Sequence, residues 1–254
     1  MRENRLKHLW QENRIALNAW LTIPSAWSAE VMAHVGYDAL TLDLQHGLID
    51  YQAALAMLQA IAAAPVVPLV RAAWNEPATL MRLLDAGAYG IICPMVNSRP
   101  EAEAFVQACR YPPAGIRSYG PSRAALYAGE DYFAFANRTV LTLAMIETTQ
   151  ALENIEAIAA TPGLDGFYVG PVDLSISLGL GERVDFTQAK LQTALDRIAQ
   201  VARAHHLVTG IHTLAPENLP ALRQRGFQLL TPATDTTLLQ VAAQSVLEHT
   251  RKAI

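Results

Sequence analysis

The sequence predicts an α/β fold, a TIM (β/α)8 barrel formed by a single domain over residues 1–254. Eight short apolar runs alternate with longer amphipathic segments, which is the order that a parallel barrel requires. The chain has 254 residues, 52% of them hydrophobic, enough for one large core, and its composition shows no break. No glycine-rich fingerprint follows an early strand, so an open Rossmann-like sheet is the second choice.

The expected strands are short runs rich in Val, Ile, Leu and Tyr. They are Ile15–Trp20, Ala39–Leu42, Val66–Val70, Gly90–Pro94, Val140–Ile146, Gly166–Val169, Leu207–Ile211 and Gln228–Thr231. The expected helices lie between them, near Ser28–Val35, Tyr51–Ala63, Pro77–Ala86, Pro100–Arg110, Ala151–Ala160, Phe186–His205, Pro216–Arg225 and Thr236–Lys252. A short helix near Glu3–Glu12 is expected to plug the bottom of the barrel. Asn75, Ser98 and Thr213 are the expected polar starts of the helices that follow them.

One long segment, Tyr111–Arg138, is expected to be irregular because several glycines and prolines interrupt it. A loop of that length inside a barrel usually serves as a lid or as an interface arm. Arg117 and Arg123 are its candidate contacts for an acidic aldehyde, within the chain or across a subunit boundary. The alternative is a plain interface loop whose arginines are solvated.

Composition excludes several classes of protein. The net charge of −4 offers no basic face for nucleic acid. The most apolar window, Ala53–Val70, is interrupted by Gln59 and two prolines, so it predicts a buried helix and a strand, not a membrane span. The charged start lacks the apolar core of a signal peptide. Cys93 and Cys109 form no metal-ligand pattern, so we expect reduced thiols in a cytoplasmic protein.

Two carboxylates lie just past two successive expected strands: Glu147 follows Ile146 directly, and Asp173 lies four residues past Val169. The carboxyl ends of barrel strands meet at one mouth, so both side chains are expected to point into the same space. Two hard oxygen ligands with open positions left over are typical of a divalent-cation site that shares its metal with a substrate. The alternative is that each acid is an ordinary helix N-cap.

Other polar groups are expected near the same mouth. His46 follows a strand and has a glycine behind it, which favours exposure and proton transfer, although a structural imidazole is the alternative. Arg71 directly follows an apolar strand, where its guanidinium could hold a carboxylate or an oxyanion. Asp85 ends a helix and opposes its dipole, which suggests a partner, either His46 or a neighbouring subunit; a solvated acid is the alternative. Trp20 and His212 stand at two further strand ends.

Several long segments resemble the metal-dependent (class II) pyruvate aldolases, typified by 4-hydroxy-2-oxoheptanedioate aldolase and 2-dehydro-3-deoxyglucarate aldolase. The segments are LTLDLQHGLID, VPLVRAAWNEPATLMRLLDAGAYGIICPMVNS, RYPPAGIRSYG, MIETTQALENI and GLDGFYVGPVDLSISLG. The resemblance runs from about Trp20 to the final helix. It implies a TIM barrel, assembled as a homo-hexamer, whose last helix is exchanged between subunits.

The resemblance also implies roles for individual residues. Glu147 and Asp173 match the acids that bind Mg²⁺ or Mn²⁺, and Co²⁺ also suits this ligand set. The 2-oxo acid chelates that ion, Arg71 matches the arginine on the keto oxygen, and His46 and Asp85 match a dyad that handles protons. The backbone of Gly170, Pro171, Val172 and Asp173 matches the cradle for the donor carboxylate. The implied substrates are a small 2-oxo acid and an aldehyde.

The chain departs from the family pattern at Gln45, Met145 and His212. All three lie near the expected mouth, so they affect the choice of donor and acceptor more than the reaction class. A polar His212 could favour hydroxylated aldehydes or a hydroxylated donor such as hydroxypyruvate. No lysine occupies a strand end, which disfavours a Schiff-base aldolase. Two alternatives remain: a lyase of the same superfamily that acts on a coenzyme A thioester, and a non-catalytic barrel subunit.

Overall fold

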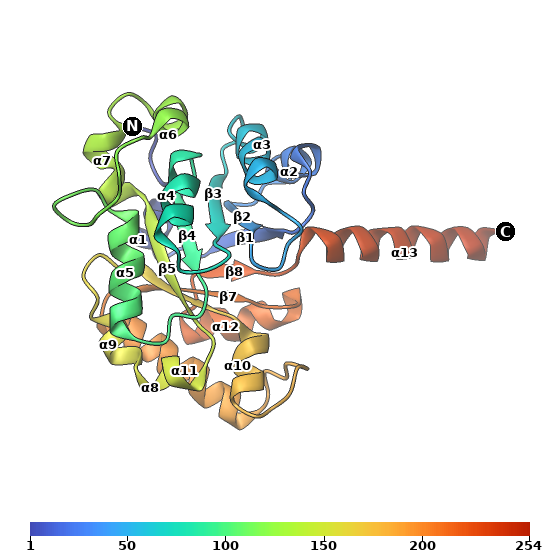
Figure 1. Ribbon diagram of the computed structural model, residues 1–254. Helices are drawn as coiled ribbons and strands as arrows, with labels where there is room; N and C mark the ends of the chain where they lie inside the picture. The colour runs from blue at the N-terminus through green and yellow to red at the C-terminus, as the bar shows by residue number, and fades with distance from the viewer.

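Eight parallel strands close into a barrel in the order β1 to β8 (Figure 1). The computed structural model describes residues 1–254. The strands are β1 (Ala16–Leu21), β2 (Ala39–Asp43), β3 (Val67–Arg71), β4 (Gly90–Cys93), β5 (Leu141–Ile146), β6 (Gly166–Val169), β7 (Val208–His212) and β8 (Leu229–Thr231). The ring closes where Ala16 of β1 pairs with Leu229 of β8. The predicted fold class is confirmed, and every strand lies within one residue of its expected bounds.

Helices alternate with the strands, and most of them cover the outside of the barrel (Figure 1). They are α1 (Arg5–Gln11), α2 (Ala26–Ala33), α3 (Tyr51–Ile61), α4 (Pro77–Asp85), α5 (Arg99–Cys109), α6 (Ser122–Ala128), α7 (Tyr132–Thr139), α8 (Thr149–Glu153), α9 (Ile155–Ala159), α10 (Pro171–Ser177), α11 (Ala189–Ala204), the 3₁₀ helix η1 (Pro216–Asn218), α12 (Leu219–Arg225) and α13 (Asp235–Ala253). No helix combines the length and the hydropathy that a bilayer crossing requires.

The strands are mostly apolar because both of their faces are covered. Every residue of β2 to β6 is buried. One face packs against the outer helices, and the other fills the barrel interior together with Leu6 and Trp10 of α1. The side chain of Asn4 fixes that helix by accepting a hydrogen bond from the Leu6 amide and donating to the carbonyls of Tyr89 and Thr139. The predicted plug at the bottom of the barrel is therefore confirmed.

Several local predictions are wrong. The segment Tyr111–Arg138 is not irregular, because it contains α6 and most of α7. Ser98 caps α5 as predicted, but Glu76, not Asn75, caps α4, since its carboxylate accepts the amides of Ala78 and Thr79. Thr213 does not cap η1, which starts after Ala215. The helix expected at Ala151–Ala160 is interrupted at Asn154, whose side-chain amide donates to the Asn97 carbonyl.

The last helix, α13, is anchored only at its start. Asp235 is buried and accepts hydrogen bonds from Thr22 and from the amide of Ile23. Beyond that point Figure 1 shows α13 projecting away from the barrel. Its apolar side chains, such as Leu239 and Val246, are exposed. A helix with uncovered apolar residues fits a role in contact between subunits, although a single chain does not test whether it is exchanged.

Candidate active site

The carboxyl ends of the strands surround a hollow of about 540 Å³, called the mouth below. The positions that line it come from β1, β2, β3, β5, β6 and β7, and from the loops that follow β1, β2 and β6 to β8. They are Trp20, Thr22, Asp43, His46, Arg71, Met145, Tyr168, Val169, Gly170, Pro171, Val172, Asp173, His212, Leu214, Ala233, Thr234 and Thr237. Most of the predicted site residues therefore converge, as the barrel geometry requires.

An ion pair between Asp43 and Arg71 lines one side of the mouth. The two residues are partners in the β2–β3 register, so their side chains leave the sheet together. Arg71 donates from Nε to Asp43 Oδ1 over 2.8 Å and from Nη2 to Oδ2 over 2.6 Å. Trp20 Nε1 also donates to Oδ2, and the amides of Gln45 and His46 donate to Oδ1. The guanidinium is thus held in one orientation, with Nη1 free of hydrogen bonds to the protein.

The same contacts keep Asp43 ionised. Burial alone would raise its pKa, but the hydrogen bonds and the charge of Arg71 outweigh that effect, and the pKa lies below its ordinary value. Asp43 was not among the expected site residues. The signal that could have revealed it is its register opposite Arg71, because facing ends of adjacent parallel strands place side chains together.

Glu147 lies at the end of β5 and is only 2% exposed. Its Oε1 accepts the amide of Met95 over 2.7 Å, whereas Oε2 has no hydrogen-bond partner in the chain. Gly170 leaves room for Oε2, because a Cβ at that position would lie 2.6 Å from it. Burial raises the pKa of Glu147, and the nearby charge of Asp173 raises it further, while the Met95 amide and Arg71 lower it.

Asp173 lies in the first turn of α10, exposed toward the mouth. Neither acid is a helix N-cap: Thr148 caps α8, and Gly170 precedes α10 without any side-chain cap. The amides of Val172 and Asp173 precede the first intrahelical bond, from Leu174 to Gly170, so they are free to bind an anion. Two adjacent carboxylates, one with an uncommitted oxygen in a buried setting, fit a divalent cation with hard oxygen ligands.

His46 is exposed at the mouth, and its backbone amide is fixed on Asp43. Asp85 does not reach it within the chain. Helices of a βα barrel run back from the mouth, so the last residue of α4 lies toward the opposite end of the barrel. There Asp85 Oδ1 accepts from Arg117 Nη2 over 2.7 Å. Burial raises the pKa of Asp85 and the bond to Arg117 lowers it, with a net rise.

Arg117 and Arg123 do not line the mouth of their own chain. The Arg117 side chain is 0% exposed and lies over the ring of Tyr111, between Asp85 and Tyr132. Arg123 donates to the carbonyl of Leu58, in the last turn of α3, and to the carbonyl of Ala86, the C-cap of α4. It therefore satisfies carbonyl groups at the C-terminal ends of both helices. Within one chain both guanidinium groups are committed to internal bonds and do not reach the mouth, and a contact with an acidic aldehyde across a subunit boundary stays a prediction.

An aromatic wall faces the ion pair. The ring of Trp20 lies 5.3 Å from Tyr168 and 6.0 Å from His212, centroid to centroid. Tyr168 shares a hydrogen bond of 2.7 Å with Thr231, which Asn18 also contacts from inside the barrel. Met145 lines the mouth, but Gln45 does not. The buried polar network around Thr231 was not predicted, because single polar residues inside apolar strands carry no distinctive spacing.

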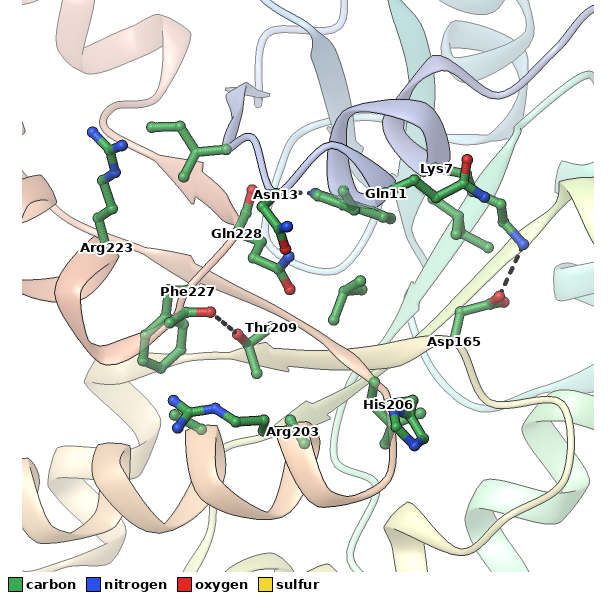
Figure 2. A pocket seen from close by; sticks show the side chains of 18 residues that line it. Lys7, Gln11, Asn13, Asp165, Arg203, His206, Thr209, Arg223, Phe227 and Gln228 are labelled. Atoms are coloured by element: carbon green, nitrogen blue, oxygen red, sulfur yellow. Dashed lines mark hydrogen bonds and ion pairs between the residues drawn. The ribbon is translucent and has the colours of Figure 1, made fainter.

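A larger hollow of about 850 Å³ lies at the amino-terminal end of the barrel (Figure 2). Figure 2 shows Lys7 pointing at Asp165, the only acid that lines this hollow. Asp165 is bound by Lys7 over 3.0 Å and by Arg110 over 2.8 Å. Its charge is therefore neutralised internally, and the hollow offers no free carboxylate for a metal ion. The mouth, not this larger hollow, has the groups needed for chemistry.

Comparison with known proteins agrees with this geometry. Residues 17–242 match the sequence model of the HpcH/HpaI aldolase/citrate lyase family. The hydroxypyruvate/pyruvate aldolase of Rhizorhabdus wittichii is 41% identical over 248 residues, covering 98% of this chain and 99% of the relative. The 4-hydroxy-2-oxo-heptane-1,7-dioate aldolase of Klebsiella pneumoniae is 36% identical, covering 96% of this chain and 92% of the relative. A crystal structure of an HpcH/HpaI family protein from Burkholderia cenocepacia superposes with a TM-score of 0.91 at 32% identity, covering 98% of this chain and 99% of that one.

Proposed function

The chain belongs to the HpcH/HpaI aldolase/citrate lyase family, and from that premise we propose that it is a divalent-metal-dependent pyruvate aldolase. It adds the enolate of pyruvate, or of a close analogue such as hydroxypyruvate, to an aldehyde, and it cleaves hydroxy-2-oxo acids in the reverse direction. The observation that supports this most strongly is that Asp173 and Arg71 line one mouth, while Glu147 lies buried behind Gly170 of the same mouth, within reach of both charges. No lysine lines that mouth, so the alternative Schiff-base route lacks its nucleophile.

Glu147 and Asp173 would hold the ion, and Mg²⁺, Mn²⁺ or Co²⁺ suits two carboxylates better than softer metals do. When bound, the ion supplies Lewis acidity that stabilises the enolate of a chelated 2-oxo acid. The amides of Val172 and Asp173, at the start of α10, bind the donor carboxylate. The backbone at Gly170 and Pro171 sets their direction, because Pro171 begins the helix and Gly170 leaves the space beside Glu147 open.

Arg71 stabilises the negative charge that develops on the keto oxygen as the C3 proton leaves. The ion pair with Asp43 supports this role, because the guanidinium is already oriented and needs no reorganisation during the reaction. Trp20, on the neighbouring strand β1, donates to the same carboxylate and so helps to fix it. The contribution of Arg71 is therefore positional as well as electrostatic.

His46 moves the proton. It is exposed at the mouth and has no hydrogen bond to the carboxylate pair, so it is placed to act on the substrate and not on the ion. Asp85 is too far away in the same chain, where it is bound to Arg117. We infer that Asp85 serves the His46 of a neighbouring subunit in a homo-hexamer, and that the exposed α13 is exchanged between subunits.

A lyase acting on a coenzyme A thioester is less well supported. Arg71 is the only permanently cationic side chain in the mouth, and Asp43 already neutralises it. A nucleotide with several phosphates would require additional basic groups. The intact set of polar groups likewise argues against a non-catalytic barrel subunit.

The test is to incubate the protein with Mg²⁺, a 2-oxo acid and a panel of aldehydes, and to identify the products by mass spectrometry. We expect hydroxy-2-oxo acids to form when the donor is a free 2-oxo acid and not a thioester. We also expect a chelator to stop the reaction until Mg²⁺ is restored. Turnover restricted to thioesters, or full activity after exhaustive chelation, would refute the proposal.

A further inference from the structure

His212 is the one side chain of the aromatic wall whose hydrogen-bonding group is uncommitted. It is the last residue of β7, and it meets Trp20 nearly edge to face, at an interplanar angle of 67°. Trp20 Nε1 is used by Asp43, and the Tyr168 hydroxyl is used by Thr231. The ring of His212 therefore presents a polar edge in a wall that is otherwise apolar toward the mouth.

The backbone fixes which nitrogen of His212 carries the proton. The amide of Leu214 donates to His212 Nδ1 over 3.3 Å, so Nδ1 must be the unprotonated acceptor. The proton of a neutral imidazole then lies on Nε2, which makes no hydrogen bond in the chain. Leu214 adopts a left-handed conformation, with φ of 63°, and this turn brings its amide back onto the ring.

The imidazole is neutral at physiological pH. Burial, and then the positive charge of Arg71, lowers the pKa of His212 to about 4. An imidazole with so low a pKa is a weak base, which makes it a poor proton acceptor near pH 7. The two histidines of the mouth therefore differ in what they can do: His46 is exposed and placed to move a proton, whereas His212 is suited to donate a hydrogen bond.

The threonine hydroxyls of the rim are already used. The hydroxyl of Thr22 donates to Asp235, and the hydroxyl of Thr234 interacts with those of Thr236 and Thr237. Arg71 is charged and is placed for the keto oxygen. The Nε2–H of His212 is thus the fixed, uncharged donor left for an uncharged oxygen of a reactant.

We propose that His212 determines specificity, and that its Nε2–H binds the hydroxyl group on the carbon next to the reacting carbonyl. Hydroxypyruvate, as donor, and glycolaldehyde, as acceptor, both carry that group, whereas pyruvate and acetaldehyde lack it. This inference rests on the proposed function and names the substrate class of the same site. A reactant without the hydroxyl leaves a partly buried N–H unpaired, which disfavours it.

The test compares wild type, His212→Leu and His212→Gln in all four combinations of pyruvate or hydroxypyruvate with acetaldehyde or glycolaldehyde. Leucine removes the donor at similar volume, and glutamine keeps an N–H near the position of Nε2. The matched control is His8→Leu, an exposed histidine on α1 at the other end of the barrel.

We expect His212→Leu to lower kcat/KM by roughly 10- to 100-fold, as one lost hydrogen bond predicts, but only in the combinations that contain the hydroxylated reactant bound by His212. Pyruvate with acetaldehyde should stay within about threefold of wild type, and glutamine should restore part of the loss. A loss only with hydroxypyruvate places the hydroxyl on the donor, and a loss only with glycolaldehyde places it on the acceptor.

Two outcomes overturn the inference and leave the proposed function intact. Equal losses in all four reactions would make His212 a general structural residue, and unchanged preference would mean that no hydroxyl binds there. If wild type turns over none of the four combinations with Mg²⁺ present, the proposed function itself fails. Thermal unfolding of each variant shows whether the fold is retained.

Discussion

Asp43→Asn tests how the mouth is held together. The carboxylate of Asp43 accepts five hydrogen bonds, two of them from Arg71. Asparagine has nearly the same shape, but it has no charge and offers one acceptor atom in place of two. Whichever way the amide is turned, its NH₂ group meets at least two donors that previously met an oxygen. Arg71 is then left as a largely buried cation without its counter-ion, since only 9% of it is exposed.

The expected loss follows from those contacts. Removing one partner of a buried ion pair typically costs about 3–5 kcal/mol. We therefore expect the free energy of unfolding of Asp43→Asn to fall by about that amount. The guanidinium also loses its fixed orientation, so we expect kcat to fall by roughly 10²-fold, as for the loss of one oxyanion donor.

The assay is urea unfolding followed by circular dichroism, together with kcat for pyruvate addition measured below the unfolding transition. The control is Asp50→Asn, at the N-cap of α3, where asparagine caps as well as aspartate and no change is expected. A loss of stability under about 1 kcal/mol with kcat within threefold of wild type would show that Arg71 does not depend on Asp43.

Three further predictions concern the proposed roles. Glu147→Gln and Asp173→Asn should each abolish tight Mn²⁺ binding measured by calorimetry, because each removes one of two carboxylates; retained binding would place the ion elsewhere. His46→Ala and Asp85→Asn should each lose most activity. Hybrid oligomers reassembled from the two variants should regain part of it, because some sites between subunits then combine the intact His46 of one variant with the intact Asp85 of the other. No recovery in verified hybrids would exclude a dyad between subunits. The pKa of His212 is about 4 in the folded chain, against 6.5 ordinarily, so as the pH falls His212 is protonated in the unfolded chain before it is protonated in the folded chain. The free energy of unfolding should therefore fall as pH drops from about 6.5 to 4, and His212→Leu should show a shallower fall; equal slopes would contradict the neutral imidazole.

The regular part of the barrel could be predicted from the sequence because each strand is a short apolar run bounded by polar or glycine residues. Elements with mixed signals were missed. The segment Pro171–Ser177 begins with Gly-Pro and is short, so a turn was as plausible as the helix α10. Glycines and prolines around α6 and α7 hid two short helices in the same way.

The residues of the candidate site likewise fall into those that the sequence could locate and those that it could not. Residues at strand ends, such as Trp20 and Arg71, could be located because the fold brings all strand ends together. Pairings between distant parts of the chain could not be located, because no local pattern encodes them. The bond between Asp85 and Arg117 links residues 32 positions apart and depends on how the segment after α5 folds back on α4. The Asp43–Arg71 pair needed the strand register.

The central claim is that this mouth forms the enolate of a 2-oxo acid with the help of a divalent ion held by Glu147 and Asp173. The most direct measurement is the exchange of the methyl protons of pyruvate for deuterium in D₂O, followed by proton NMR without any aldehyde. The account predicts exchange with Mg²⁺ or Mn²⁺, none above background after chelation, and none with Glu147→Gln at the same metal concentration. Exchange that persists unchanged in the chelated protein or in Glu147→Gln, or its absence from the metal-saturated wild type, would contradict it.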